Sequence, residues 1–170
     1  GNTGTILFSG AVGQTNDFDV ITITGNLDLD ADIGADNFSA AGATSIAVSG
    51  ASNLGKDVTT SGTQTYTGAV TLSGEAINLK GTTIQFGSTV AGGTQNLKVD
   101  GIMDLNGAMT NVAILEITGA SNIGANISTT GTQTYTSAVT LDKAPAGATV
   151  LTATNNSAVL FSSTIDGTQD

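Results

Sequence analysis

The chain has 170 residues and a formal net charge of −10, from 12 Asp and 2 Glu against 4 Lys, with no Arg, His or Cys. This balance excludes a nucleic-acid partner and disfavours an anionic membrane surface, because too few basic side chains are present to neutralise phosphates. The lack of Cys and His excludes disulfides, thiolate metal sites, and the commonest general base and metal ligand.

Composition also limits the core. Aromatic residues make up only 4% of the chain and Trp is absent, so Val, Ile, Leu and Ala must supply most of the buried surface. No apolar run is long enough to cross a bilayer, and no signal peptide is present, so any export signal would lie outside this sequence. Short β-branched runs between Gly, Asn and Ser residues predict an all-β protein.

The first predicted strand, residues 6–8, belongs to a motif that occurs three times. TILFSGAVGQTND at Thr5–Asp17 recurs as TIQFGSTVAGGTQN at 83–96 and as AVLFSSTIDGTQD at 158–170. The central residue of the strand is Leu7, Gln85 or Leu160, and a glutamine indicates a position that reaches water. The flanking residues are therefore predicted to be buried: Ile6, Phe8, Ile84, Phe86, Val159 and Phe161.

The next strand, residues 20–24 (VITIT), matches residues 97–100 (LKVD). Apolar and polar residues alternate in both, which is the period of a strand with one buried face. Lys98 is predicted to point outward. Gly25 and Gly101 are predicted to turn the chain after these strands.

Residues 26–33 (NLDLDADI) are predicted to form one strand with Asp28, Asp30 and Asp32 on its outer face. Three aspartates about 6.6 Å apart along a strand are a candidate calcium site. The alternative is a solvated outer face, because the spacing does not match an EF-hand loop and the second repeat keeps only Asp104. A short helical turn is expected near 36–43, and no helical period occurs elsewhere.

A longer repeat then dominates the chain. GASNLGKDVTTSGTQTYTGAVTL at Gly50–Leu72 recurs as GASNIGANISTTGTQTYTSAVTL at Gly119–Leu141, with 16 of 23 positions identical. The preceding strands, 45–49 and 114–118, also match. Tyr66 and Tyr135 occupy identical TQTYT contexts, which suggests either a carbohydrate-stacking pair or, more economically, a large core side chain in each repeat.

Together these echoes indicate a period of about 75 residues, the sign of a repeat architecture. The first repeat is assigned to residues 1–83, the second to 84–158 and the opening of a third to 159–170, all within one continuous solenoid, so the chain is expected to be cut from a longer array. Stacked triangular coils of roughly 20 to 25 residues, each rising ~4.8 Å, predict a right-handed parallel β-helix of about seven or eight coils.

The motifs IxFxSTV…GTQ, GASNIGxxISTTGTQTY and AVTL resemble the repeats of large filamentous-haemagglutinin-like bacterial surface proteins. The resemblance covers nearly the whole chain. It implies a non-catalytic, β-helical stalk at the cell surface or outside the cell, in a filament or adhesin whose repeats continue end to end. Its expected partners are identical repeats or copies of itself, and the surface of a host or neighbouring cell.

Three other functions remain open. The N-terminal NTGTILFSGAV suits the donor strand of a donor-strand-complemented pilin subunit. A polysaccharide-cleaving enzyme would use clustered carboxylates, for which Asp28, Asp30, Asp100 and Asp104 are the candidates, although no Arg or His accompanies them. Ice binding is suggested by repeated Thr-x-Thr pairs, which do not recur at a single coil spacing.

Overall fold

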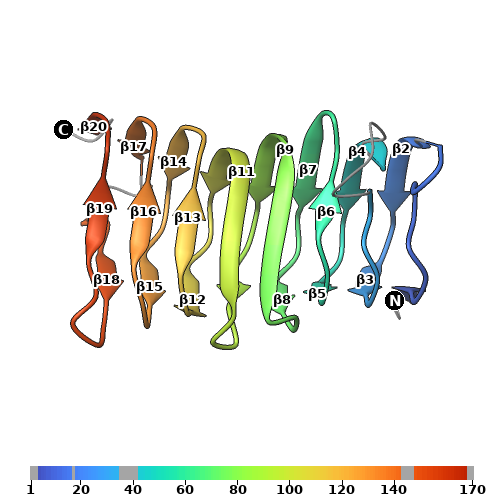
Figure 1. The fold of residues 1–170 in the computed structure, drawn as a ribbon, viewed down its shortest axis with the longest axis horizontal. Coiled ribbons are helices and arrows are strands. Elements are labelled where there is room, and N and C mark those ends of the chain that lie inside the picture. Colours follow the sequence, from blue (N-terminus) through green and yellow to red (C-terminus); the bar gives the residue numbers. More distant parts are fainter. Residues whose placement is uncertain (1–3, 17, 35–41, 143–147, 168–170) are drawn as a thin grey trace.

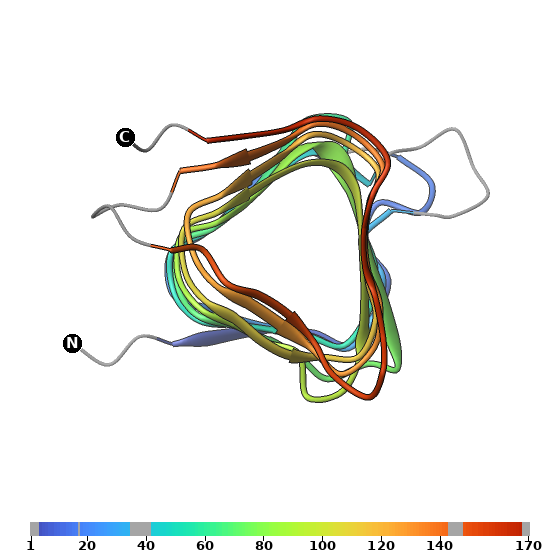
Figure 2. The same ribbon diagram turned by 90° about the vertical axis from the view of Figure 1, so that its left-hand side faces the viewer.

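A computed structural model describes residues 4–16, 18–34, 42–142 and 148–167, and within these ranges it contains 20 β-strands and no helix. The described residues accordingly include no helix that is long and apolar enough to cross a membrane. The chain winds into a rod with its termini at opposite ends (Figure 1). Viewed from the C-terminal end, the triangular coil runs counter-clockwise toward the reader, so it is right-handed (Figure 2). The predicted β-solenoid is confirmed.

Each coil passes through three faces, A, B and C, in that order. Face A contains β1 (Thr5–Phe8), β3 (Asn26–Leu29), β5 (Ser52–Leu54), β8 (Val70–Leu72), β10 (Val90–Ala91), β12 (Met109–Val112), β15 (Ile127–Thr129) and β18 (Leu151–Ala153). Face B contains β6 (Val58–Thr59), the first parts of β9 (Ala76–Phe86) and β11 (Asn96–Leu105), β13 (Leu115–Ile117), β16 (Gln133–Tyr135) and β19 (Val159–Phe161).

Face C contains β2 (Phe18–Ile23), β4 (Ala43–Val48), β7 (Thr63–Tyr66), the second parts of β9 and β11, β14 (Ser121–Ile123), β17 (Val139–Leu141) and β20 (Ile165–Gly167). Face A is eight strands deep, so seven full turns separate its first and last strands. At ~4.8 Å per coil these turns span about 34 Å. All paired strands among the described residues are parallel. The length of a coil varies: one turn can be as short as the step from Ser52 to Val70 or as long as the step from Gln133 to Val159.

The alternating sequence explains the core. Successive side chains of a strand point to opposite sides, so every second residue enters the interior of the rod. In β9, for example, the inward side chains are buried: Ile77, Leu79, Ile84 and Phe86. The side chain of Gln85 points outward and is half-buried. Because partners are parallel and in register, each inward residue stacks on an inward residue of the next coil.

Two corners need glycine, as predicted. Gly25 has φ +136° and Gly101 has φ +156°, a region that residues with a Cβ rarely adopt. A Cβ on either would also lie within 2.7 Å of a carbonyl oxygen in the coil below, Gly4 O or Gly81 O. Each residue combines an unusual backbone angle with close contact between coils.

One prediction about a strand was wrong, and one about a helical turn is largely untested. Residues 26–33 do not form one strand: β3 ends at Leu29, a corner follows, and Ile33 lies on face B, where it bridges Val12 and Val58. Leu29 and Ile33 are both buried, but against different sides of the triangle. The helical turn expected near 36–43 lies outside the described residues, except that 43 begins β4.

The burial prediction for the three I/V-x-F strands is confirmed only in the interior. Ile84 and Phe86 are fully buried, Phe8, Val159 and Phe161 are partly buried, and Ile6 is 46% exposed. Ile6 pairs in register with buried Leu27, so its side chain does point inward. It is exposed because β1 belongs to the first coil and, in the part of the chain that the structure describes, has a neighbouring strand on one side only.

The sequence repeat is out of phase with the coils. Ser52 lies on face A and its counterpart Ser121 on face C, while Gln64 lies on face C and its counterpart Gln133 on face B. The path from one copy to the next makes three full turns plus two faces, so each copy begins one face earlier than the last. The three I/V-x-F strands follow the same rule, with β1 on face A, β9 on face C and β19 on face B.

Candidate functional site

Two aromatic stacks lie inside the rod. Tyr66 of β7 stacks on Phe86 of β9 with ring centroids 5.9 Å apart, and Tyr135 of β16 stacks on Phe161 of β19 at 5.0 Å. Both tyrosines are fully buried, so neither ring is available to a carbohydrate. The interpretation of these tyrosines as core residues is confirmed.

A buried glutamine satisfies each tyrosine hydroxyl. Tyr66 Oη donates to Gln64 Oε1 at 3.1 Å, and Gln64 Nε2 donates to the carbonyl oxygens of Val58 (2.9 Å) and Lys80 (2.8 Å). Gln64 therefore uses both ends of its amide inside the core, which removes the cost of burying it. Desolvation by burial raises the pKa of Tyr66 well above its usual value.

The second repeat builds the same arrangement on face B. Tyr135 Oη donates to Gln133 Oε1 at 2.9 Å, and Gln133 Nε2 donates to the carbonyl oxygen of Thr152 at 2.8 Å. Burial likewise raises the pKa of Tyr135. Sequence reasoning missed these glutamines because glutamine was treated as an outward residue. Each glutamine lies two residues before a tyrosine on the same strand and therefore points to the same side, and this spacing is the signal in the sequence that identifies it as inward.

The three aspartates of the calcium hypothesis do not share one strand: Asp28 is on β3, and Asp30 and Asp32 lie at the corner that follows it. Asp28 lies outward on β3 and accepts a hydrogen bond from Asn53 Nδ2 at 2.8 Å, while Asp32 Oδ1 accepts one from the backbone N–H of Asp57 at 3.1 Å. Asp30 lies between them, exposed, after β3 has ended. Within the described ranges, no three acidic side chains are grouped as metal ligands would be. Calcium binding stays a prediction from the sequence.

Polar donors from adjacent coils stabilise other carboxylates as well. Asp104 accepts a hydrogen bond from Gln85 Nε2 at 3.0 Å, and Asp142 accepts one from Asn122 Nδ2 at 3.0 Å. Gln85 and Asp104 are register partners on neighbouring coils, whereas Asp142 lies two residues after Thr140, the register partner of Asn122. Hydrogen bonds to a charged acceptor are stronger than those between neutral groups. The acidic outer faces thus obtain part of their stabilisation from side-chain amides.

The carboxylates proposed for an enzyme are not brought together. Asp28 and Asp30 lie in the coil of β3, whereas Asp100 and Asp104 lie on β11, three coils farther along the rod. Three coils correspond to about 14 Å along the axis, before the difference in faces is added. A glycosidase pair needs two carboxyl groups facing one another across a cleft, so these four do not form one.

Threonine does not form a ladder on face C. The outward positions of face C, in successive coils, are Thr22, Ala47, Thr65, Gln85, Asp104, Asn122, Thr140 and Asp166. Because the sequence repeat rotates by one face, the Thr-x-Thr pairs are distributed around the rod. The regular array expected of an ice-binding surface is therefore not formed on this face.

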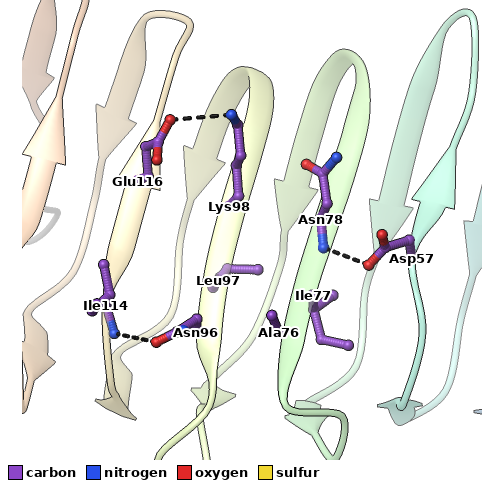
Figure 3. Close-up of a pocket in the computed structure, with 9 residues that line it drawn as sticks. All are labelled: Asp57, Ala76, Ile77, Asn78, Asn96, Leu97, Lys98, Ile114 and Glu116. Atoms are coloured by element: carbon purple, nitrogen blue, oxygen red, sulfur yellow. Dashed lines mark hydrogen bonds and ion pairs between the residues drawn. The ribbon is translucent and has the colours of Figure 1, made fainter. Parts of the chain in front are cut away.

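A shallow groove of about 320 Å³ crosses the outside of face B (Figure 3). At one end, Lys98 Nζ of β11 pairs with Glu116 Oε1 of β13 at 3.1 Å, and the two side chains are 43% and 45% exposed. Elsewhere in the groove, the Asn78 N–H donates to Asp57 Oδ1 at 2.8 Å and the Ile114 N–H donates to Asn96 Oδ1 at 3.2 Å. These polar groups form hydrogen bonds and an ion pair with one another between neighbouring coils, so they stabilise the rod.

The two ends of the rod are its most apolar exposed regions. Among the described residues, nine large hydrophobic side chains are exposed, and seven of them belong to the first or last coil: Ile6, Leu7, Phe18, Val20, Val150, Leu160 and Ile165. In the same described ranges, β1 and β2 at one end and β18, β19 and β20 at the other each have a paired strand on one side only. Such edges carry unpaired backbone donors and acceptors and attract further strands.

Comparison of the chain with protein-family models, with curated proteins and with solved structures yields no match.

Proposed function

We propose that this chain is a structural, non-catalytic segment of an extracellular bacterial filament or adhesin stalk, in which repeats continue or assemble end to end. The observation that carries the proposal is the pair of open ends, where inward-pointing residues such as Ile6 and Ile165 are 46% and 50% exposed. A further coil on either side would cover them and pair the free strand edges.

Three further features support a structural role. The likeness of the repeats to those of filamentous-haemagglutinin-like surface proteins favours a stalk at the cell surface. The groove on face B is crossed by hydrogen bonds and an ion pair within the rod, and the carboxylates of the enzyme hypothesis lie far apart. Identical repeats are the proposed partners along the axis, and a host or neighbouring cell surface is the proposed target of the whole stalk.

The test is assembly of the chain in solution, measured by sedimentation and electron microscopy. We expect concentration-dependent, end-to-end association into rods. Ile165→Lys, which places a charge at the open C-terminal end, should reduce it strongly, whereas Thr71→Lys, which adds the same charge to the exposed outside of face A, should not. A chain that stays monomeric at high concentration with ordered end coils contradicts the proposal.

The donor-strand pilin is the alternative, and the N-terminal segment distinguishes the two. Residues 5–8 form β1, which pairs in register with β3 of the same chain as an ordinary coil strand. A pilin would lose polymerisation, but not its fold, when this segment is deleted. In the stalk, deletion should move the open end to β3 and leave association by the new end intact.

A further inference from the structure

Strand β1 lies at the N-terminal edge of the rod, and the two other copies of its sequence, in β9 and β19, show which strand fits that edge. Strand β1 reads TILF and the equivalent part of β9 reads TIQF. In the coil above, Ile6 and Phe8 meet Leu27 and Leu29, as Ile84 and Phe86 meet Met103 and Leu105. The upper neighbours of the two strands are therefore alike.

Below the interior strand, the neighbour is always Gln-Thr-Tyr. Gln64 and Tyr66 lie under Ile84 and Phe86, and Gln133 and Tyr135 lie under Val159 and Phe161. The tyrosine ring stacks on the phenylalanine ring in both cases, at 5.9 Å and 5.0 Å. The same pairing on two different faces indicates that it depends on the two strands and not on a particular side of the triangle.

Strand β1 has no strand below it among the described residues, although its inward side chains are those of the other two copies. Phe8 is only partly buried, and Ile6 is 46% exposed. In β9 the equivalent residues, Phe86 and Ile84, are fully buried once β7 is in place. The apolar surface left open at β1 thus corresponds to the surface that a Gln-Thr-Tyr strand covers elsewhere.

The backbone of β1 is also free for such a strand. The N–H groups of Asn26 and Asp30 donate to Gly4 O (3.0 Å) and Phe8 O (2.9 Å), so the even-numbered residues face β3. Because backbone groups alternate in direction along a strand, those of Thr5 and Leu7 face the open edge.

On β9, the corresponding edge is occupied by β7. Gly87, which has the same parity as Gln85, donates its N–H to Tyr66 O at 2.8 Å. Gln85 is the counterpart of Leu7, so the N–H of Leu7 points to where the backbone of a Gln-Thr-Tyr strand would lie.

We propose that the open edge of β1 binds a parallel strand with the sequence Gln-Thr-Tyr, supplied by another repeat of this type, with the glutamine under Ile6 and the tyrosine stacked on Phe8. This inference rests on the proposed end-to-end function and adds the identity of the joining strand. Another folded copy of this chain does not present such a strand, because Phe86 and Phe161 already cover both tyrosines. Copies of the folded chain therefore meet without this stack.

The test uses the intact chain and a synthetic peptide with the sequence of residues 61–70, SGTQTYTGAV. We expect the peptide to bind one per chain and to slow hydrogen exchange at the Leu7 amide, as followed by NMR. A peptide with serine in place of the tyrosine should bind about tenfold more weakly, since the ring stack and its buried area are lost.

Two variants of the chain complete the test. Leu7→Pro removes the N–H that faces the open edge and keeps the bonds of β1 to β3, so it should abolish binding. Leu7→Gln, which turns TILF into the TIQF of β9, should bind the peptide as the unaltered chain does. Three results would each overturn the inference: absence of binding, equal binding of the tyrosine and serine peptides, or binding that survives Leu7→Pro. End-to-end association of the chain is measured separately, and its outcome tests the proposed function alone.

Discussion

Residues 50–72 and 119–141 are nearly the same sequence in two different places. The first copy occupies faces A, B, C and A in turn, and the second occupies C, A, B and C. Both bury most of the same positions, including Gln64 and Gln133 at 0% exposure and Tyr66 and Tyr135 at 0%, although Leu72 is buried and its counterpart Leu141 only partly. The three faces of the triangle are therefore equivalent environments, and the repeat encodes a path of strands and corners without encoding which face it lies on.

One position shows where the two copies differ. A Cβ on Gly68 would lie 2.3 Å from Gly50 O, so this position, at a corner between faces C and A, does not accept a larger residue. Its counterpart Ser137 lies at the corner between faces B and C, where its hydroxyl donates to Thr118 O at 2.8 Å. The strands of the two copies are thus alike on different faces, whereas the residues at the corners differ between the copies.

The largest expected effect contrasts the two aromatic stacks. Phe86→Ala should lower the free energy of unfolding by about 3–5 kcal/mol, because it removes a fully buried ring and leaves a cavity. Phe161→Ala should cost clearly less, because Phe161 is only partly buried in the last coil. Urea unfolding followed by circular dichroism measures both losses. Equal losses would mean that the last coil is as well covered as the interior.

The next effect is alkaline destabilisation through the two tyrosines. Burial raises the pKa of Tyr66 and Tyr135 in the folded chain above the ordinary value of 10.0. The stability they contribute is present below pH 10 and is lost as the pH rises toward the folded-state pKa. At pH 11 each should lower the free energy of unfolding by on the order of 1 kcal/mol.

Ultraviolet titration of tyrosinate beside circular dichroism measures this alkaline transition. Both hydroxyls should ionise only as the fold is lost, although they lie on different faces. Ionisation of either near pH 10 in a folded chain would contradict the burial described above.

Much of the fold was predictable from the sequence, and the reasons are local. The alternation of apolar and polar residues in AINLK and TIQF identifies the inward side chains directly. The recurrence of the motif that contains Ile84 and Phe86 indicates a solenoid, because a single repeat cannot bury its own apolar face and must stack on its neighbours. The path at corners was less predictable. NLDLDADI alternates perfectly, yet the chain bends after Leu29, since alternation continues across a corner that leads to another face.

The phase of the repeat and the contents of its core were beyond sequence reasoning for different reasons. Coil length is not constant, because the turn from Gln133 to Val159 is longer than the turn from Ser52 to Val70, so a period in the sequence does not give a whole number of turns. Gln64 is polar by composition and buried only because Tyr66 and two carbonyls satisfy it. Such compensation depends on contacts between coils that one strand does not reveal.

The buried glutamines provide the next test of equivalence. Gln64→Leu and Gln133→Leu should each cost about 1–3 kcal/mol, since the tyrosine hydroxyl and the backbone carbonyls lose their partners inside the core. The loss at Gln64 should be at least as large as that at Gln133, because Gln64 donates to two backbone carbonyls and Gln133 to one. Gln85→Leu, on the half-buried outer side, is the comparison: it removes a hydrogen bond to Asp104 that water can replace, so it should cost less than either core substitution. A harmless Gln64→Leu would show that the amide contributes nothing to the core.

The smallest effect concerns a defect that both copies share. Ser52 Oγ and Ser121 Oγ are buried at the start of equivalent strands and make no hydrogen bond. Burying a hydroxyl removes its hydrogen bonds to water, and without a partner in the protein this loss is not compensated. Ser52→Ala and Ser121→Ala should therefore each raise the free energy of unfolding by up to about 1 kcal/mol. Ser137→Ala is the control, because it removes a bond to Thr118 O and should lower stability instead. The measurement is the urea midpoint of each variant. If both Ser52→Ala and Ser121→Ala lower that midpoint, the hydroxyls have partners in solution, and the shared position is part of what the repeat maintains on every face.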